Sequence, residues 1–276
     1  MNVRTREIIF QLKKFIKQLG ASAIETYSAQ AAFYVMIAMF PFIMLIMTLI
    51  QFLPVSQKEL QDILFSIVPK DTGPFMQSVM TDIHQKASGT LISITAVTTL
   101  WAASNGVFSL MKGINSAYRP KFPETRGYIK LKAISIIFTV FFIIMLIATM
   151  GVLVFGNRIQ EWIEGNFQGL TGTAGIILSL RTIIGIVILT VFSLTMYVLV
   201  PNRKGRVREE LPGAVISAVG WVVFSYAYSF YIDKLSNYSK FYGSMTAVVL
   251  LMLWLYFCMY IMLLGAQINV FIQNRK

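Results

Sequence analysis

The chain has 276 residues, of which 56% are hydrophobic and 13% are charged, and its mean hydropathy is +0.68. These values exclude a single water-soluble domain and are typical of a multi-pass membrane protein. The net charge of +12 would suggest nucleic-acid binding in a soluble protein. In a membrane protein the same excess of Lys and Arg belongs to the cytosolic segments that fix orientation, so we expect no nucleic-acid partner.

The amino-terminal segment, residues 1–20, predicts an amphipathic helix. It lacks the apolar core and the small-residue cleavage site of a removable signal peptide. Its apolar residues recur at helical spacing, and its basic residues lie largely opposite them. The apolar positions are Ile8, Ile9, Leu12, Phe15, Ile16 and Leu19, and the basic positions are Arg4, Arg6, Lys13, Lys14 and Lys17. Such a helix either lies along an anionic membrane surface or docks on the protein's own cytosolic side.

Six apolar segments are long enough to cross a bilayer, which takes about 20 residues. They are residues 29–53, 91–110, 131–155, 178–200, 211–232 and 244–272. We therefore predict an all-α fold, a polytopic membrane helix bundle with six transmembrane helices that forms a single membrane domain over residues 1–276. The one cysteine, Cys258, lies in the last apolar segment and excludes an internal disulfide.

The Lys and Arg residues between the spans favour an orientation with both termini in the cytoplasm. In that orientation most of the 24 Lys and Arg residues fall in cytosolic segments. They are Arg4, Arg6, Lys13, Lys14, Lys17, Lys112, Arg119, Lys121, Arg126, Lys130, Lys132, Arg203, Lys204, Arg206, Arg208, Arg275 and Lys276.

The first external connection, residues 54–90, predicts a helical hairpin. Ser56 and Glu59 form a capping box in front of one apolar face. Gly73 and Pro74 open a second segment with helical periodicity. The hairpin either covers the membrane ends of the spans or acts as a lid over them.

The spans carry neutral polar residues but no charged residue near their middles, and the nearest charges are Glu25 and Arg181 at span ends. A relay of buried carboxylates is therefore not predicted. In the second span, one helical face is small and hydroxylated. This face either serves close helix packing or forms the wet wall of a cavity. It contains Thr95, Thr98, Thr99, Ala102, Asn105, Gly106 and Ser109.

Four spans present polar residues at similar depth near their cytosolic ends. We predict that these residues line a cavity open to the cytosol and contact a substrate. The alternative is a set of hydrogen bonds between helices without a cavity. The predicted contact residues are Glu25, Ser28, Gln30, Asn105, Ser109, Thr195, Tyr197, Gln267 and Asn269.

Pro41 interrupts the first span. Proline has no N–H, and it crowds the carbonyl four residues earlier, which is that of Ile37. Membrane helices tolerate the freed carbonyl where a neighbour or a water-lined space satisfies it. Pro41 is therefore either a hinge above the polar residues or a fixed kink that shapes packing.

Four long stretches of the chain resemble the YihY/BrkB family of bacterial inner-membrane proteins, over about residues 25–269. In chain order they read AAFYVMIAMFPF, LWAASNGVFSLMKGINSAYRP, VPNRKGRVREELPGAVISAVGW and YSKFYGSMTAVVLLMLWLYFCMYIMLLGAQIN. The resemblance implies a six-helix integral protein of the bacterial plasma (inner) membrane. The family has carried the name ribonuclease BN, which is generally held to be mistaken, and transport or envelope roles are the usual suggestions for it.

The chain departs from the family in its last motif. The family commonly reads LGAELN there, whereas this chain has Gln267 in place of the acid. A role that needs a negative charge at this position is therefore not carried over to this chain. A neutral amide can still hydrogen-bond a polar headgroup or a neighbouring helix.

Two functions fit these observations. The first is a transporter-like protein that moves or flips an amphiphilic or lipid-like solute, with membrane lipids as partners. The second is a non-transporting scaffold or partner subunit in envelope integrity, whose basic cytosolic loops bind another protein or anionic headgroups. An enzyme is not expected, because the only histidine, His84, cannot build a histidine-rich metal site and we find no catalytic dyad. We expect no metal and no cofactor.

Overall fold

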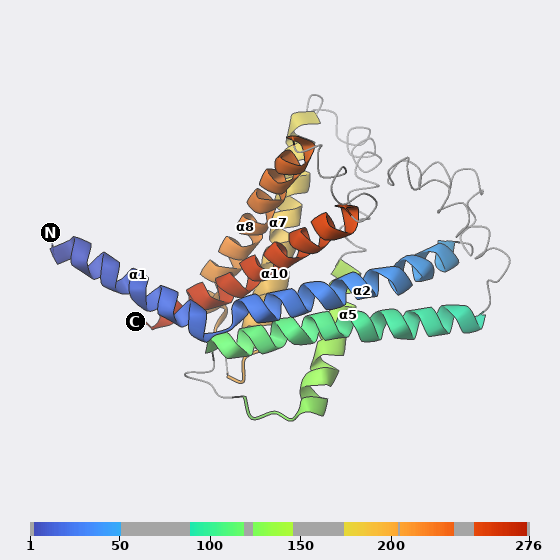
Figure 1. The fold of residues 1–276 in the computed structure, drawn as a ribbon, viewed down its shortest axis with the longest axis horizontal. Helices are drawn as coiled ribbons and strands as arrows, with labels where there is room; N and C mark the ends of the chain where they lie inside the picture. Colours follow the sequence, from blue (N-terminus) through green and yellow to red (C-terminus); the bar gives the residue numbers. More distant parts are fainter. Residues whose placement is uncertain are drawn as a thin grey trace, which may run out of the picture. The chain divides into compact units, whose positions relative to one another are not determined.

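The computed structural model describes residues 3–50, 89–118, 124–145, 174–203, 205–234 and 246–274, and the regular structure in these ranges is α-helical (Figure 1). The all-α class predicted from the sequence is therefore confirmed for the described ranges. The helices are α1 (Val3–Ala21), α2 (Ile24–Ile50), α5 (Gly89–Tyr118), a helix over Tyr128–Met145, α7 (Ala174–Leu199), α8 (Val207–Lys234) and α10 (Thr246–Gln273). The hairpin predicted at residues 54–90 lies outside the described residues, apart from the two that begin α5.

Four helices in the described part of the chain are long and apolar enough to cross a membrane. They cover Ser93–Tyr118, Tyr128–Met145, Val207–Ile232 and Val248–Gln273, and the stretch Ile183–Leu199 of α7 is apolar as well. α10, for example, has 28 residues and no charged side chain. At 1.5 Å per residue it is about 42 Å long, more than the hydrocarbon core of about 30 Å. The chain is thus a multi-pass membrane protein, while the count of six spans stays a prediction.

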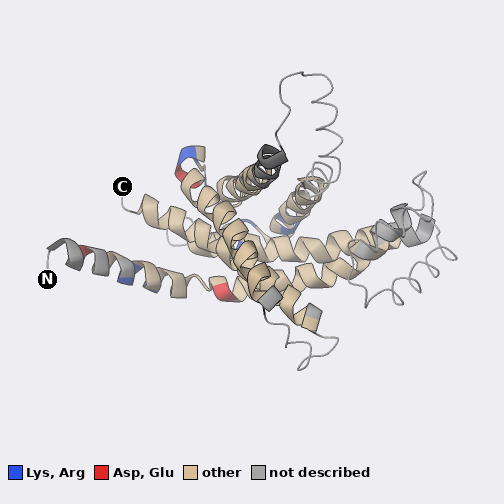
Figure 2. Cartoon of the chain, turned by 90° about the horizontal axis from the view of Figure 1, so that it is seen from above, with Lys and Arg blue, Asp and Glu red and all other residues tan. Residues whose placement is uncertain are grey.

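The surfaces of these helices match a lipid environment. α2 has one charged residue, Glu25 in its first turn, and Figure 2 shows long uncharged stretches in the helix bodies. Large apolar side chains on several helices point outward, among them Ile137 (68% exposed) and Val223 (61% exposed). Exposed apolar surface of this extent marks a membrane or protein contact.

Several helices extend beyond the apolar segments seen in the sequence. α5 continues past residue 110 to Tyr118, α8 begins at Val207 rather than at 211, and the third predicted span begins at Tyr128 rather than at 131. Hydropathy locates the hydrocarbon layer, whereas helix propagation continues into polar sequence at little cost. Lys132 and Glu210 therefore lie inside spanning helices, each within five residues of a helix end. They do not contradict the prediction that no charge lies near the middle of a span.

The described residues form two compact units. One contains Met1–Phe33 and Ser104–Lys276, and the other contains Tyr34–Ala103, so α2 and α5 contribute to both. Pro41 belongs to the second unit, and α2 remains α-helical on both sides of it, from Ile24 to Ile50. The hinge at Pro41 stays a prediction.

In the first unit, α1 contacts the end of α10. The rings of Phe15 and Phe271 meet edge to face, with their centroids 5.1 Å apart. A short turn joins α1 to α2, in which Ala23 has a positive φ of 49° and the Ser22 hydroxyl donates to the carbonyl of Leu19 at 2.9 Å. The structure thus has a helix where the sequence predicts one, while its setting, along a membrane surface or on the cytosolic side of the protein, stays a prediction.

α8 packs against both α7 and α10 in this unit. Two glycines allow the backbones of α8 and α10 to touch, because a Cβ at Gly213 would overlap the carbonyl oxygen of Gly265. A Cβ at Gly265 would in turn overlap the hydroxyl of Ser217. Small residues at helix contacts are the usual means of close packing in membranes, where dispersion replaces the hydrophobic effect.

This contact predicts a strong position dependence of Gly→Ala substitutions. Gly265→Ala should destabilise the protein by about 1–3 kcal/mol, because the added methyl group overpacks the contact. Gly185→Ala is the matched control, since a Cβ at Gly185 in α7 would meet nothing within 4 Å and alanine is the better helix former by about 1 kcal/mol. Thermal unfolding of the purified protein in detergent should show a lower Tm for Gly265→Ala and an equal or higher Tm for Gly185→Ala. Equal shifts for both variants would contradict the assigned contact.

Candidate functional site

A buried carboxylate lies in the first turn of α8. The helix begins at Val207 and places Glu209 and Glu210 in this turn, where the positive end of the helix dipole favours acids. Glu210 is fully buried, whereas the Glu209 side chain is 34% exposed. A buried charge is tolerated when it is paired and hydrogen-bonded, so the partners of Glu210 determine whether this turn can be buried.

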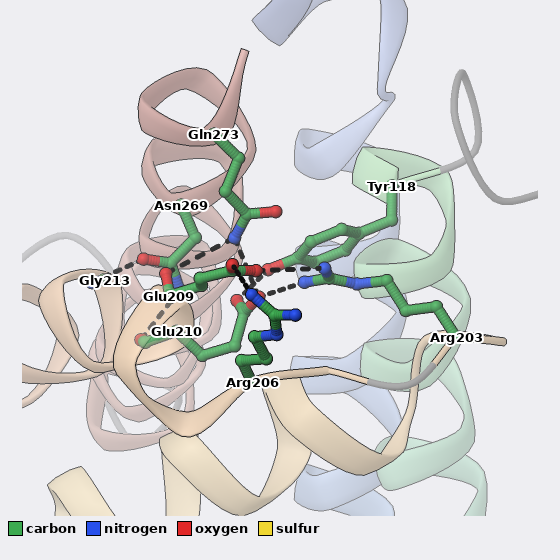
Figure 3. Close-up of polar contacts among 8 residues, drawn as sticks. All are labelled: Tyr118, Arg203, Arg206, Glu209, Glu210, Gly213, Asn269 and Gln273. Atoms are coloured by element: carbon green, nitrogen blue, oxygen red, sulfur yellow. Dashed lines mark hydrogen bonds and ion pairs between the residues drawn. The ribbon is translucent and has the colours of Figure 1, made fainter. Parts of the chain in front are cut away.

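Side chains from three other parts of the chain donate to the Glu210 carboxylate (Figure 3). The Tyr118 hydroxyl, at the end of α5, donates to Oε2. Arg203, in the connection before α8, forms an ion pair with Oε1, and its guanidinium carbon lies 4.7 Å from the centroid of the Tyr118 ring. Gln273 Nε2, on α10, donates to Oε1 at 2.8 Å. We call Tyr118, Arg203, Glu210 and Gln273 the Glu210 cluster.

Asn269 joins α10 to the backbone of α8 on either side of Pro212. Its Nδ2 donates to the carbonyl of Glu210 at 2.9 Å, and its Oδ1 accepts from the N–H of Gly213 at 2.7 Å (Figure 3). Proline within a helix has no N–H to donate to the helix ladder. The Asn269 amide thus supplies hydrogen bonds where the ladder of α8 is weakened.

Tyr197 forms a second polar connection, among α7, α8 and α10. Its hydroxyl lies 2.7 Å from Ser217 Oγ on α8 and donates to the carbonyl of Met262 on α10 at 2.5 Å. Both Tyr197 and Ser217 are buried. Buried hydroxyls that are satisfied in this way fix the register of neighbouring helices.

A buried ammonium group connects the helix Tyr128–Met145 to α5. Lys132 is 6% exposed, and its Nζ donates to Ser104 Oγ at 2.8 Å and to Asn105 Oδ1 at 2.5 Å. From the sequence alone, Lys132 and Arg203 were predicted to be basic residues of cytosolic segments. The structure buries both side chains, because each meets polar groups from another helix.

Glu124 fixes the connection that follows α5. Its carboxylate accepts hydrogen bonds from Asn115 Nδ2 at 2.8 Å and from Arg126 Nη2 at 2.5 Å. Arg126 Nη2 also donates to the carbonyl of Val200 at 2.5 Å. The hydrogen bonds from Arg126 hold the pKa of Glu124 below its ordinary value. Glu124 therefore stays ionised at neutral pH and keeps two connections of the first unit together.

The structure places the residues predicted to contact a substrate in different settings. The hydroxyls of Ser28, Ser109 and Thr195 donate to the carbonyl four residues earlier in their own helices, at 2.7, 3.0 and 2.7 Å. Glu25 is exposed and Gln30 is half-buried. Three others take part in bonds between helices, namely Asn105 with Lys132, Tyr197 with Ser217 and Asn269 with α8. The cavity that the nine residues were predicted to line stays a prediction.

Gln267 differs from the other eight residues. It is fully buried, and neither its Nε2 nor its Oε1 has a hydrogen-bond partner among the described residues. It follows Leu263 by one helical turn and so shares its face of α10. The Leu263 side chain meets α5 at Gly113, where a Cβ would also approach Tyr27 of α2. The amide therefore lies on the face of α10 that is directed toward α5 and α2.

Sequence reasoning missed most of the Glu210 cluster. Glu210, Tyr118 and Gln273 stand at the ends of apolar segments, where charged and aromatic residues are common for reasons of topology alone. One local signal was present, since an acid pair directly after a basic run opens an apolar segment at Glu209 and Glu210. Its meaning depended on partners that are distant in the sequence.

Comparison with known proteins identifies one family and several relatives that match most of the chain. Residues 15–276 match the family described as Virulence factor BrkB. The chain is similar to the putative ribonuclease-like protein YfkH of Bacillus subtilis (strain 168), with 29% identity over 270 residues that cover 96% of each chain. It is also similar to a UPF0761 membrane protein of Aggregatibacter aphrophilus (strain NJ8700), with 25% identity over 91% of this chain and 86% of the relative. No solved structure matches the chain.

The Glu210 cluster predicts that two adjacent acids, Glu209 and Glu210, contribute very differently to the stability of the protein. Glu210→Gln should destabilise the protein by about 3 kcal/mol, because it leaves Arg203 without its buried counter-charge. Glu209→Gln is the matched control, since its carboxylate is 4.0 Å from Arg203 and 3.8 Å from the exposed Arg206 and such pairs contribute about 0–1 kcal/mol. Thermal unfolding in detergent should show a clear loss of Tm for Glu210→Gln alone. Similar Tm values for the two variants would contradict the buried ion pair.

Proposed function

Because the chain belongs to the BrkB family of membrane proteins, we propose that it is transporter-like and moves or flips an amphiphilic, lipid-like solute across the membrane. The observation that carries this proposal is the buried amide of Gln267, which has no hydrogen-bond partner among the described residues. The polar headgroup of the solute would hydrogen-bond to this amide while the solute crosses the bilayer.

The buried position of the Gln267 amide does not contribute to the stability of the fold. A buried polar group without a partner costs about 1–3 kcal/mol, and leucine would fill a similar volume without that cost. Asn269, two residues further along α10, has both sides of its amide engaged by α8. A polar group that is retained against stability is expected where a protein binds or moves a polar ligand.

The surrounding ionisable groups support the same proposal. Charged residues inside spanning helices are expensive and mark substrate pathways or the structures that frame them. Glu210 and Lys132 are buried within spanning helices, and each binds side chains from another part of the chain. We assign them the framing role, because their polar atoms are already engaged, and we assign the ligand contact to Gln267.

We also propose a six-span topology in the bacterial inner membrane with both termini in the cytoplasm. The basic residues of the predicted cytosolic segments support this orientation. α1 would lie at the cytosolic surface, with Phe15 on Phe271 of α10 and with Phe10 and Ile16 exposed toward the lipid boundary. Lys13, Lys14 and Lys17 are exposed on the same helix and suit an anionic leaflet.

We propose no nuclease activity, although the Bacillus subtilis relative is named ribonuclease-like. The single histidine of this chain, His84, cannot supply a histidine-rich metal site.

A pair of identical substitutions on α10 tests the role of Gln267. In liposomes, wild-type protein should accelerate the movement of a fluorescent phospholipid above the rate in protein-free vesicles. Gln267→Leu should lower that rate about fivefold, the effect of one lost hydrogen bond of about 1 kcal/mol, and should maintain or raise the Tm. Gln273→Leu is the control, because Gln273 donates to Glu210 and its loss should lower the Tm.

Two outcomes would overturn the proposal. If the wild-type rate equals that of protein-free vesicles, transport is excluded, and the non-transporting scaffold becomes the proposed function. A lower Tm for Gln267→Leu would show that the amide has a structural partner, and it would then need no ligand.

The orientation is tested by labelling single cysteines. In a Cys258→Ala background, Asn274→Cys at the end of α10 should react with a membrane-impermeant maleimide only after the cells are permeabilised. Ser239→Cys, in the segment that the sequence places outside the last two spans, should react in intact cells. The reverse pattern would invert the proposed topology.

A further inference from the structure

Two lysines and a tyrosine surround the ring of Phe108 near the end of α5. Lys112 Nζ lies 4.5 Å from the centroid of this ring, and Lys132 Nζ lies 5.7 Å from it. The Tyr128 ring meets Phe108 edge to face at a centroid distance of 5.4 Å. We call Phe108, Lys112, Tyr128 and Lys132 the Phe108 cluster. It combines two positive charges with aromatic groups at one end of two spanning helices.

The two lysines of the cluster have different roles. Lys132 is buried and held by Ser104 and Asn105, so its charge is fixed in position. A charge within a medium of low dielectric constant acts over a longer distance than one in water. Lys112 is exposed and can reach a ligand directly. Glu124, which lies four residues before Tyr128, is engaged by Arg126 and Asn115.

An apolar stripe begins beside the cluster and follows the helix Tyr128–Met145. Its residues are Ile129, Ile137, Val140 and Ile144, which are 83%, 68%, 42% and 59% exposed. Their spacing puts them on one face of the helix, and this helix is long and apolar enough to span the membrane. Tyr128 itself is 62% exposed, as is typical of an aromatic residue at the membrane boundary.

We propose that the Phe108 cluster binds the phosphate of an anionic phospholipid, with one acyl chain lying along the stripe from Ile129 to Ile144. Lys112 forms an ion pair with the phosphate, and the Tyr128 hydroxyl donates a hydrogen bond to it. Lys132 adds a fixed positive charge from its buried position. The site faces the leaflet at this end of the helices, which is the cytosolic leaflet in the orientation proposed above. A soluble phosphate would gain nothing from the apolar stripe, so the geometry favours a lipid.

The test measures lipid preference with the full-length protein in phosphatidylcholine vesicles. Electron spin resonance with spin-labelled lipids gives the association of phosphatidylglycerol relative to phosphatidylcholine. Wild type should prefer phosphatidylglycerol severalfold, and Lys112→Gln should lower this preference about fivefold, the effect of one lysine at an anionic surface. Tyr128→Phe should lower it about threefold through loss of one hydrogen bond. Lys112→Arg, which keeps the positive charge at the cluster, should leave the preference close to that of the wild type.

Three results would overturn the inference. These are no preference in the wild type, an equal loss for Lys112→Arg and Lys112→Gln, or displacement of the labelled lipid by millimolar inorganic phosphate, which would indicate a soluble anion. The site does not depend on transport, because it holds a lipid at the protein surface. Gln267→Leu should therefore keep the preference for phosphatidylglycerol even where it slows lipid movement, so the two proposals can fail separately.

Discussion

One buried negative charge holds the helix ends of the first unit together. Glu210 is fully enclosed, and removal of a carboxylate from water is costly unless several donors replace the water. The donors come from the end of α5, from the connection before α8 and from the last turn of α10. These three segments must therefore be in place together before the first turn of α8 can be buried. The Glu210 cluster thus sets the geometry in which the other polar contacts form.

The close approach of α8 and α10 depends on the same geometry. Gly213 and Gly265 allow backbone contact, and this contact brings Asn269 within reach of the α8 backbone and Ser217 within reach of Tyr197. In lipid, such hydrogen bonds and close packing replace the hydrophobic effect as the forces that join helices. Glu210, Lys132 and Asn269 are satisfied by bonds to other segments, and Ser28 and Ser109 by the carbonyl four residues earlier in their own helices. Gln267 stands out against them because it lies on the same helix and has no partner among the described residues.

The basic residues of this chain have more than one role. Insertion topology explains why they gather between the spans, but it does not explain why Arg203 and Lys132 are buried against groups from other helices. These two residues stabilise the fold, whereas Lys112 and the lysines of α1 remain exposed. Of these residues, only the exposed ones can meet the headgroups of the surrounding lipid, and in the site that we propose Lys112 does so beside a fixed second charge.

The sequence by itself determined the membrane class, the helical fold and the approximate positions of the four spans found in the described residues, because hydropathy and helical periodicity are local properties. It also selected Tyr197, Gln267 and Asn269 as polar residues within spans, although it could not tell which of them had partners. Only the tertiary structure decided that Glu210 and Lys132 are buried and that α8 touches α10 at Gly213. The reason is physical: burial and hydrogen bonding depend on which helix faces a residue, and the partners of Glu210 at Tyr118 and Gln273 are far from it in the chain.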